Sequence, residues 1–301
     1  MRTPRPRALL LPMVLAALLL AACGGARTAS KVADPFSGGY PTFRDEATGI
    51  TAILGTPDLG VGTFRVAIAL NDRTGLIRFP ALALESYRPG TTGAANTGGD
   101  APAERVSAGF FAFPDGIRGL YAASMTFDRA GTWTITAAVP RADGGAARIT
   151  IPVTIAARAS APGVGAPAPS SKNRTAKDVP SLDRLTTGSA PDPALYRRRI
   201  ADSLAAHRPL VVVFASPAFC TTPLCGPQVE EAAELAQAYG DRVDFVHIDL
   251  FDNPHEIKGD LKRAVRSPLL KEWGLRTDQW TFVIDANGAV VARFEAFAPR
   301  P

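Results

Sequence analysis

Apolar residues follow a period of two over the middle third of the chain. Between about Gly49 and Ala157, apolar side chains alternate with polar or small ones in four runs, at 64–70, 121–127, 133–139 and 149–155. Turn signals rich in Asp and Gly lie between runs, and such alternation is typical of antiparallel strands with one buried face. No helical period interrupts them, so the pattern predicts an all-β sandwich over residues 49–158.

The pattern changes in the last third of the chain and predicts an α/β domain over residues 194–301. Apolar residues recur at helical spacing over 196–207 and 229–239. Between these helices, 210–215 is a continuous apolar run, as expected of a strand buried on both faces of a parallel sheet. The remaining elements expected here are a helix at 260–266 and strands at 243–249, 280–284 and 289–294.

Composition and charge refine this division. Residues 160–181 combine Pro, Gly, Ala and Ser without hydrophobic periodicity, so we expect a linker over residues 159–193. The 301 residues are enough for two domains. The formal net charge of +5 includes three arginines in the first seven residues, so it gives no reason to expect a nucleic-acid partner.

The N-terminus has the composition of an export signal. Three arginines precede an apolar run at 8–20, and two alanines and Cys23 end it. This ending resembles the bacterial lipoprotein signal, which implies that residues 1–22 are removed, that Cys23 carries a lipid, and that residues 23–48 form a flexible tether. The protein is then expected to be lipid-anchored at the extracytoplasmic face of the cell membrane. The alternative is an ordinary cleaved signal that happens to end at a cysteine.

A short motif in the middle third also resembles a known module. Gly131, Thr132 and Trp133 are similar to the Gly-x-Trp strand of small immunoglobulin-like modules on bacterial exported proteins. The resemblance implies an immunoglobulin-like sandwich and no activity. This region holds neither cysteine nor histidine, so it offers no thiol and no typical metal site, and we expect a spacer or protein-contact role.

The remaining two cysteines lie between the apolar run at 210–215 and the helix at 229–239. That order, with Phe219-Cys220 and then Cys225-Gly226-Pro227 before the helix, resembles the thioredoxin superfamily. The resemblance implies that Cys220 attacks a substrate disulfide and that Cys225 resolves the mixed disulfide. A helix N-terminus favours the reactive thiolate. The residues implied as substrate-facing or supporting are Phe219, Pro223, Gly226, Pro227 and Trp280.

Departures from that family keep a second interpretation open. Four residues separate the cysteines where the family usually has two, no proline lies at 278–281, and the strand at 211–215 holds no acid. In this interpretation Cys220 and Cys225 form a stabilising disulfide in a non-catalytic surface lipoprotein that binds partners.

Copper delivery, as in proteins of cytochrome oxidase assembly that share the thioredoxin-like fold, is a third interpretation. It lacks a placed third ligand, because His207, His247 and His255 are each expected to be structural or exposed. The sequence thus predicts an immunoglobulin-like sandwich followed by an α/β thioredoxin-like domain. Its predicted function is exchange with protein thiols or disulfides beside the membrane, without a cofactor, a metal or nucleic acid.

Overall fold

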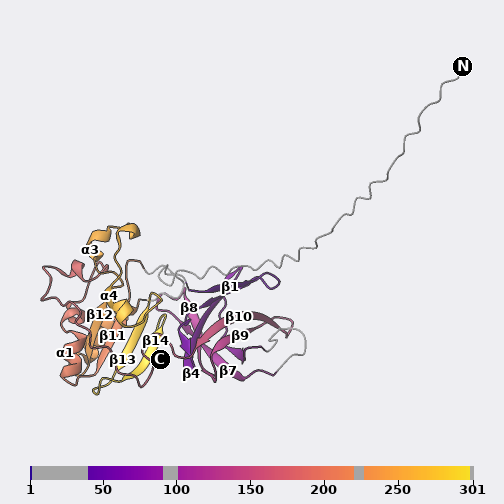
Figure 1. Ribbon diagram of the computed structural model, residues 1–301, viewed down its shortest axis with the longest axis horizontal. Helices are drawn as coiled ribbons and strands as arrows, with labels where there is room; N and C mark the ends of the chain where they lie inside the picture. The colour runs from indigo at the N-terminus through magenta and orange to yellow at the C-terminus, as the bar shows by residue number, and fades with distance from the viewer. Residues whose placement is uncertain (2–39, 91–100, 220–226, 299–301) are drawn as a thin grey trace. The chain divides into compact units, whose positions relative to one another are not determined.

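The computed structural model describes Met1 and residues 40–90, 101–219 and 227–298. Strands make up 39% and helices 15% of the described residues, and these strands form two sheets (Figure 1). Both sheets lie in one compact unit, Ala33–Pro301. The fold is therefore built mainly from strands.

The first sheet runs β1-β2-β4-β8-β7-β6-β9-β10-β3, with β5 beside β4. Neighbouring strands are antiparallel except for β3 and β10, which are parallel. The strands predicted at 64–70, 121–127, 133–139 and 149–155 are confirmed as β4, β8, β9 and β10. The bounds are Thr42–Asp45 (β1), Ile50–Leu54 (β2), Leu59–Gly60 (β3), Gly62–Asp72 (β4), Gly75–Leu76 (β5), Ala81–Tyr87 (β6), Glu104–Ala112 (β7), Gly119–Phe127 (β8), Gly131–Pro140 (β9) and Ala146–Ala156 (β10).

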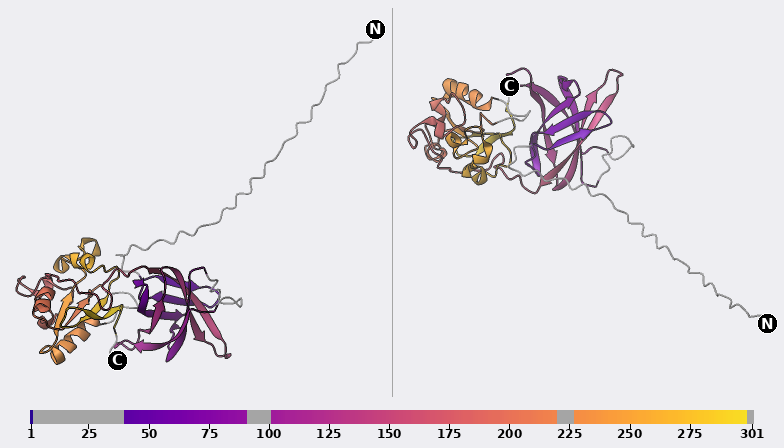
Figure 2. Two further views of the ribbon diagram at one scale, coloured as in Figure 1. Left: turned by 60° about the horizontal axis from the view of Figure 1, so that its bottom comes forward. Right: turned by 90° about the horizontal axis from the view of Figure 1, so that it is seen from above.

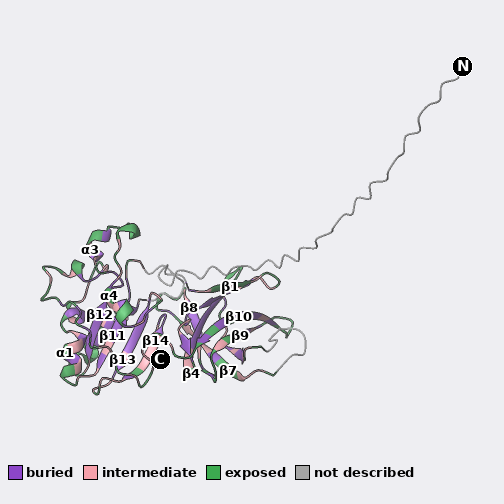
Figure 3. Ribbon diagram, viewed as in Figure 1, coloured by how far each residue is buried: buried purple, intermediate pink, exposed green. Residues whose placement is uncertain are grey.

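The predicted immunoglobulin-like sandwich is wrong, because these strands form one sheet and not two. Pairing continues without a break from β8 through β7 and β6 to β9, where a sandwich would have a gap. The sheet curls into a half-barrel (Figure 2), and β10 contacts β1 and β2 across the curl. Twisted sheets of this many strands curl to cover their apolar face. The core lies inside the curl, as Figure 3 shows, with Val66, Tyr121, Trp133 and Ile151 fully or nearly fully buried.

The second sheet has the order β12-β11-β13-β14. Strand β11 is parallel to β12 and antiparallel to β13, and β13 and β14 form a hairpin. The four strands predicted in this region are confirmed, and so is the helix at 229–239. The bounds are Leu210–Phe214 (β11), Asp244–Ile248 (β12), Trp280–Ile284 (β13), Val290–Glu295 (β14), Ile200–Ala205 (α1), Gln228–Tyr239 (α2), Pro254–Ile257 (α3) and Pro268–Glu272 (α4), with 3₁₀ helices at Leu182–Arg184 (η1), Pro193–Tyr196 (η2) and Leu261–Arg263 (η3).

The predicted α/β thioredoxin-like domain is contradicted by the small helical content of this region. Of the helices in the described residues, α2 has 12 residues and the other α-helices have four to six. Pro254 and Pro268 stand at the first position of α3 and α4, and Lys258, with φ 50°, ends α3 after one turn. The predicted helix at 260–266 is wrong as well, since only three residues there form η3 and Ala264 is extended.

The Pro-rich segment between the sheets is held in place by hydrogen bonds. Gly165 and Ala166 exchange backbone hydrogen bonds with Val290 of β14, at 2.8 and 2.9 Å. The hydroxyl of Ser171 is bonded to both Glu272 (2.9 Å) and the indole nitrogen of Trp273 (2.8 Å). Residues 165–171 therefore follow the edge of the second sheet rather than crossing solvent as free chain.

Candidate functional site

The ends of the two parallel strands of the second sheet bring polar side chains together. Ser216 lies two residues after β11 and Asp249 directly follows β12. Because parallel strands end at the same edge of a sheet, the two residues are neighbours there. Both are almost fully buried, with 1% and 3% exposure. Together with Thr187, Tyr196 and His247 they form what we call the strand-end cluster.

Asp249 is the acidic member of this cluster. Its carboxylate accepts hydrogen bonds from the backbone and hydroxyl of Thr187 (2.7 and 2.9 Å) and from the backbone of Phe251 (3.1 Å). The Thr187 hydroxyl also bonds the Ser216 hydroxyl at 2.9 Å. Burial raises the pKa of Asp249 to about 6, although the hydrogen bonds oppose the shift. This carboxyl therefore exchanges a proton close to neutral pH.

His247 is a fixed, neutral member of the cluster. Its Nε2 lies 3.0 Å from the carbonyl oxygen of Ala215, which only accepts hydrogen bonds, so Nε2 carries the proton. Nδ1 therefore accepts from the hydroxyl of Tyr196 at 2.7 Å. Burial lowers the pKa of His247 to about 4 and raises that of Tyr196. With both ring nitrogens engaged, His247 serves to hold the end of β11 rather than to bind a metal.

Most of the residues singled out from the sequence fall outside the part of the chain that the structure describes. These are the lipid-attachment residue Cys23, both cysteines of the motif, and their neighbours Pro223 and Gly226. The residues on either side are described. Phe219 donates its backbone N–H to Ser216 at 3.2 Å, and its ring meets that of Phe251 edge-on at 5.7 Å. Pro227 immediately precedes α2.

Trp280 is part of the core. It is fully buried and its ring stacks on that of Phe282, with centroids 5.6 Å apart and planes at 3°. The guanidinium of Arg293 lies 4.9 Å from the ring centroid. Phe219 packs against the same apolar cluster. Trp280 therefore supports the sheet beneath this edge and presents no surface to a substrate.

Two hollows adjoin the strand-end cluster. One of about 490 Å³ is lined by residues of the 186–196 segment, by Pro217 and Ala218, and by the first turns of α2. The other, of about 260 Å³, reaches Tyr196, His247 and Asp249. The edge of the second sheet at which the cysteine segment (residues 220–226) begins is therefore accessible from two sides.

The strand-end cluster includes residues that the sequence did not single out. Thr187 falls within the predicted linker, 62 positions before Asp249 in the chain. Asp249 had one usable signal, because it is the carboxylate that ends the strand predicted at 243–249. In the described ranges, no group of three His, Cys, Asp or Glu side chains is placed to hold a metal ion.

No family model, curated protein or solved structure matches the chain. Within the described residues, none of the helices has the length and apolar character needed to span a bilayer.

Proposed function

We propose that this protein performs thiol–disulfide exchange through Cys220 and Cys225, at the extracytoplasmic face of a membrane to which a lipid on Cys23 anchors it. The observation that carries the proposal is the buried carboxyl of Asp249, with a pKa of about 6, at the sheet edge where the cysteine segment begins. Buried acids with a pKa near neutrality are typical of sites that move protons.

The exchange runs in two steps. The Cys220 thiolate attacks one sulfur of a substrate disulfide, forms a mixed disulfide and releases the other substrate sulfur as a thiolate. Cys225 then loses its proton and attacks Cys220, which forms the Cys220–Cys225 disulfide and releases the second substrate thiolate. The substrate disulfide is reduced and the protein dithiol is oxidised. We assign to Asp249 the uptake of the proton that Cys225 loses.

The larger hollow beside the cluster supports access by a polypeptide. It lies along Pro217 and Ala218, which lead into the cysteine segment, and along Val229 and Ala233 of α2. An extended substrate chain in this hollow would lie beside Pro217, Ala218 and the start of α2.

The test uses the full chain with Cys23→Ser, which carries no lipid and leaves two cysteines. We expect it to reduce insulin disulfides when a chemical reductant recharges it, and we expect Cys220→Ser or Cys225→Ser to abolish turnover. Unchanged turnover in both variants would refute the proposal. A reduction potential below about −300 mV would also refute it and would favour a structural disulfide in a partner-binding protein.

The role of Asp249 is tested by the pH dependence of the rate. We expect the rate to rise with an apparent pKa near 6, because only the ionised carboxylate accepts a proton. Asp249→Asn should remove this rise from the dependence of the rate on pH. The matched control is Asp252→Asn, since Asp252 is half exposed and pairs with Arg174 at the surface. A pH dependence that keeps this rise in Asp249→Asn would contradict the assigned role.

A further inference from the structure

A hollow of about 1100 Å³ lies between the first sheet, the segment after β10 and strand β14. This exceeds the volume of most sites for small molecules. Its walls are mainly apolar, with the large side chains coming from both sheets and from the segment between them: Val61, Phe64, Phe111, Val164, Val291 and Phe294.

Three of these side chains are exposed to solvent although they are large and apolar. Val61 is 42% exposed, Val164 69% and Val291 49%. They come from three separate segments: the link between β3 and β4, the segment after β10, and β14. A single exposed valine is normal for a protein surface, but three that converge on one hollow indicate a surface meant to be covered.

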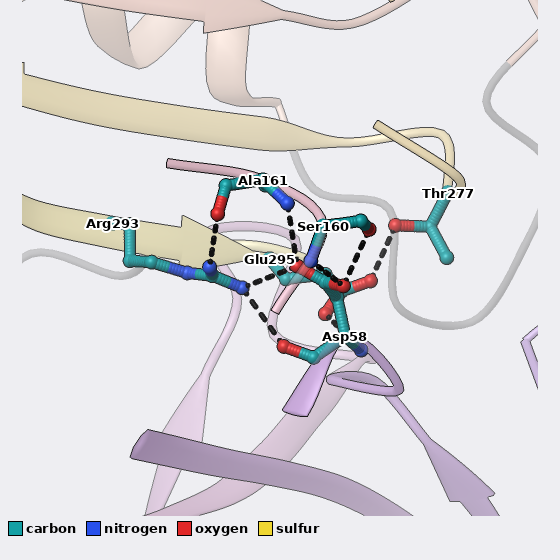
Figure 4. A network of polar contacts seen from close by, with 6 residues as sticks. All are labelled: Asp58, Ser160, Ala161, Thr277, Arg293 and Glu295. Atoms are coloured by element: carbon teal, nitrogen blue, oxygen red, sulfur yellow. Dashed lines mark hydrogen bonds and ion pairs between the residues drawn. The ribbon is translucent and has the colours of Figure 1, made fainter. Parts of the chain in front are cut away.

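The polar groups at the base of this hollow are occupied by one another, as Figure 4 shows. Asp58 pairs with Arg293 at 2.9 Å and accepts from the backbone and hydroxyl of Ser160. Glu295 accepts from the backbone of Asp58 (3.0 Å) and from the hydroxyl of Thr277 (2.6 Å). The base therefore leaves no polar side chain in need of a ligand partner, and the body of a ligand here would be apolar.

The charged groups around the hollow favour an anion. The cations are Arg65, Arg158 and Arg293, and the carboxyls are Asp58, Glu272 and Glu295. Glu295 is fully buried, which raises its pKa to about 8, so it is largely uncharged at neutral pH and leaves positive charge in excess. Arg158 is exposed, and its side chain makes no hydrogen bond or ion pair with any other described residue. It is therefore free to meet an anionic group.

We propose that this hollow binds a single-chain amphiphile with an anionic head group. The alkyl chain covers Val61, Val164 and Val291, and the head group meets Arg158. The ligand class is a long-chain carboxylate or alkyl phosphate, because both join an apolar chain to one anion. The inference does not depend on the cysteines, which take no part in this site.

Binding is measured on the full chain with Cys23→Ser, which needs no detergent. The probe is 1-anilinonaphthalene-8-sulfonate, an apolar anion whose fluorescence rises on binding. Dodecanoate and dodecyl phosphate are then titrated separately as competitors, which distinguishes the two head groups. We expect at least one of them to displace the probe, and we expect uncharged dodecanol to compete several-fold less well.

Variants locate the site. Val164→Asp and Val291→Asp should each weaken binding about tenfold, because they place a carboxylate where the alkyl chain lies. Arg158→Glu should weaken it about threefold to fivefold. The matched controls are Ile117→Asp and Arg141→Glu, at exposed residues that do not line the hollow.

Both valines are exposed, so these variants should keep the thermal unfolding midpoint of the parent chain. Equal probe binding by the hollow variants and the controls would overturn the proposal. Competition by dodecanol as strong as that by dodecanoate would also overturn it, since the anion would then contribute nothing.

Discussion

The two sheets bury different kinds of residue. In the described part of the first sheet, Glu85 is the one buried charged side chain, and two arginines, Arg105 and Arg148, neutralise it. The second sheet also buries one paired acid, Asp244 of β12, which Arg208 contacts at 3.0 Å. It differs in burying three groups without an ion pair: His247 and Asp249 at one edge and Glu295 at the end of β14. Because a buried group without an ion partner has a shifted pKa, the second sheet holds these shifted groups, and the first sheet holds the larger apolar core.

The largest expected effect tests the apolar side of this comparison. Trp133 is 1% exposed, meets Phe127 edge-on at 5.2 Å and donates its indole N–H to the carbonyl of Arg129. Trp133→Ala should lower the free energy of unfolding by about 3–5 kcal/mol, because it opens a cavity in the core. Trp133→Phe should lower the free energy of unfolding by less than Trp133→Ala does. Urea denaturation followed by circular dichroism measures both, and a loss under about 1 kcal/mol in Trp133→Ala would contradict this view of the core.

The strands of the first sheet could be predicted, but their closure could not. Alternation in β10 shows which side chains are buried, because each face of a strand takes every second residue. In β4 it does not, since Val66–Leu70 are buried on both faces of the strand. It does not show how many strands pair without a gap, which separates a half-barrel from a sandwich. Strand β3 has two residues, Leu59 and Gly60, and so has no period to detect.

At the candidate site, the sequence could predict that polar residues follow a buried strand at Ser216. It could not predict that Thr187 reaches Asp249. That contact depends on how a Pro-rich segment without periodicity packs against the sheet. The helix predicted at 260–266 failed because Ala264 is extended and ends η3 after three residues, which the apolar spacing did not indicate.

The second prediction tests the buried ionisable groups of the second sheet, using Glu295. Burial raises its pKa from 4.5 to about 8, so the folded protein binds more protons than the unfolded chain between these pH values. Stability should therefore be full below pH 4.5 and should fall as the pH rises toward 8, by on the order of 4 kcal/mol.

Glu295→Gln should flatten this fall, because the amide oxygen still accepts a hydrogen bond and the side chain does not ionise. Urea unfolding at a series of pH values measures the effect. Glu46→Gln, at an exposed residue, is the matched control and should keep the slope of the parent chain. The comparison of the two sheets fails if Glu295→Gln and Glu46→Gln show the same pH dependence.

The smallest expected effect concerns the Pro-rich segment after β10, which includes Ser160 and lies along both sheets. Gly274 has φ 65°, and a Cβ there would lie well inside contact distance of the carbonyl oxygen of Ser160. Gly259 has a similar φ of 83° with open space around it. Both alanine variants incur left-handed strain of about 1–2 kcal/mol, but Gly274→Ala must also displace backbone.

We therefore expect Gly274→Ala to be less stable than Gly259→Ala by about 2 kcal/mol in urea denaturation. Displacement of Ser160 also removes its hydrogen bonds to Asp58, which lies at the base of the large hollow. Gly274→Ala should then weaken binding of the amphiphile probe, while Gly259→Ala should not. Equal stability of the two variants would mean that the segment at Ser160 can shift without lowering the free energy of unfolding. The two sheets would then be joined mainly by the apolar contacts of Phe297 with Phe113.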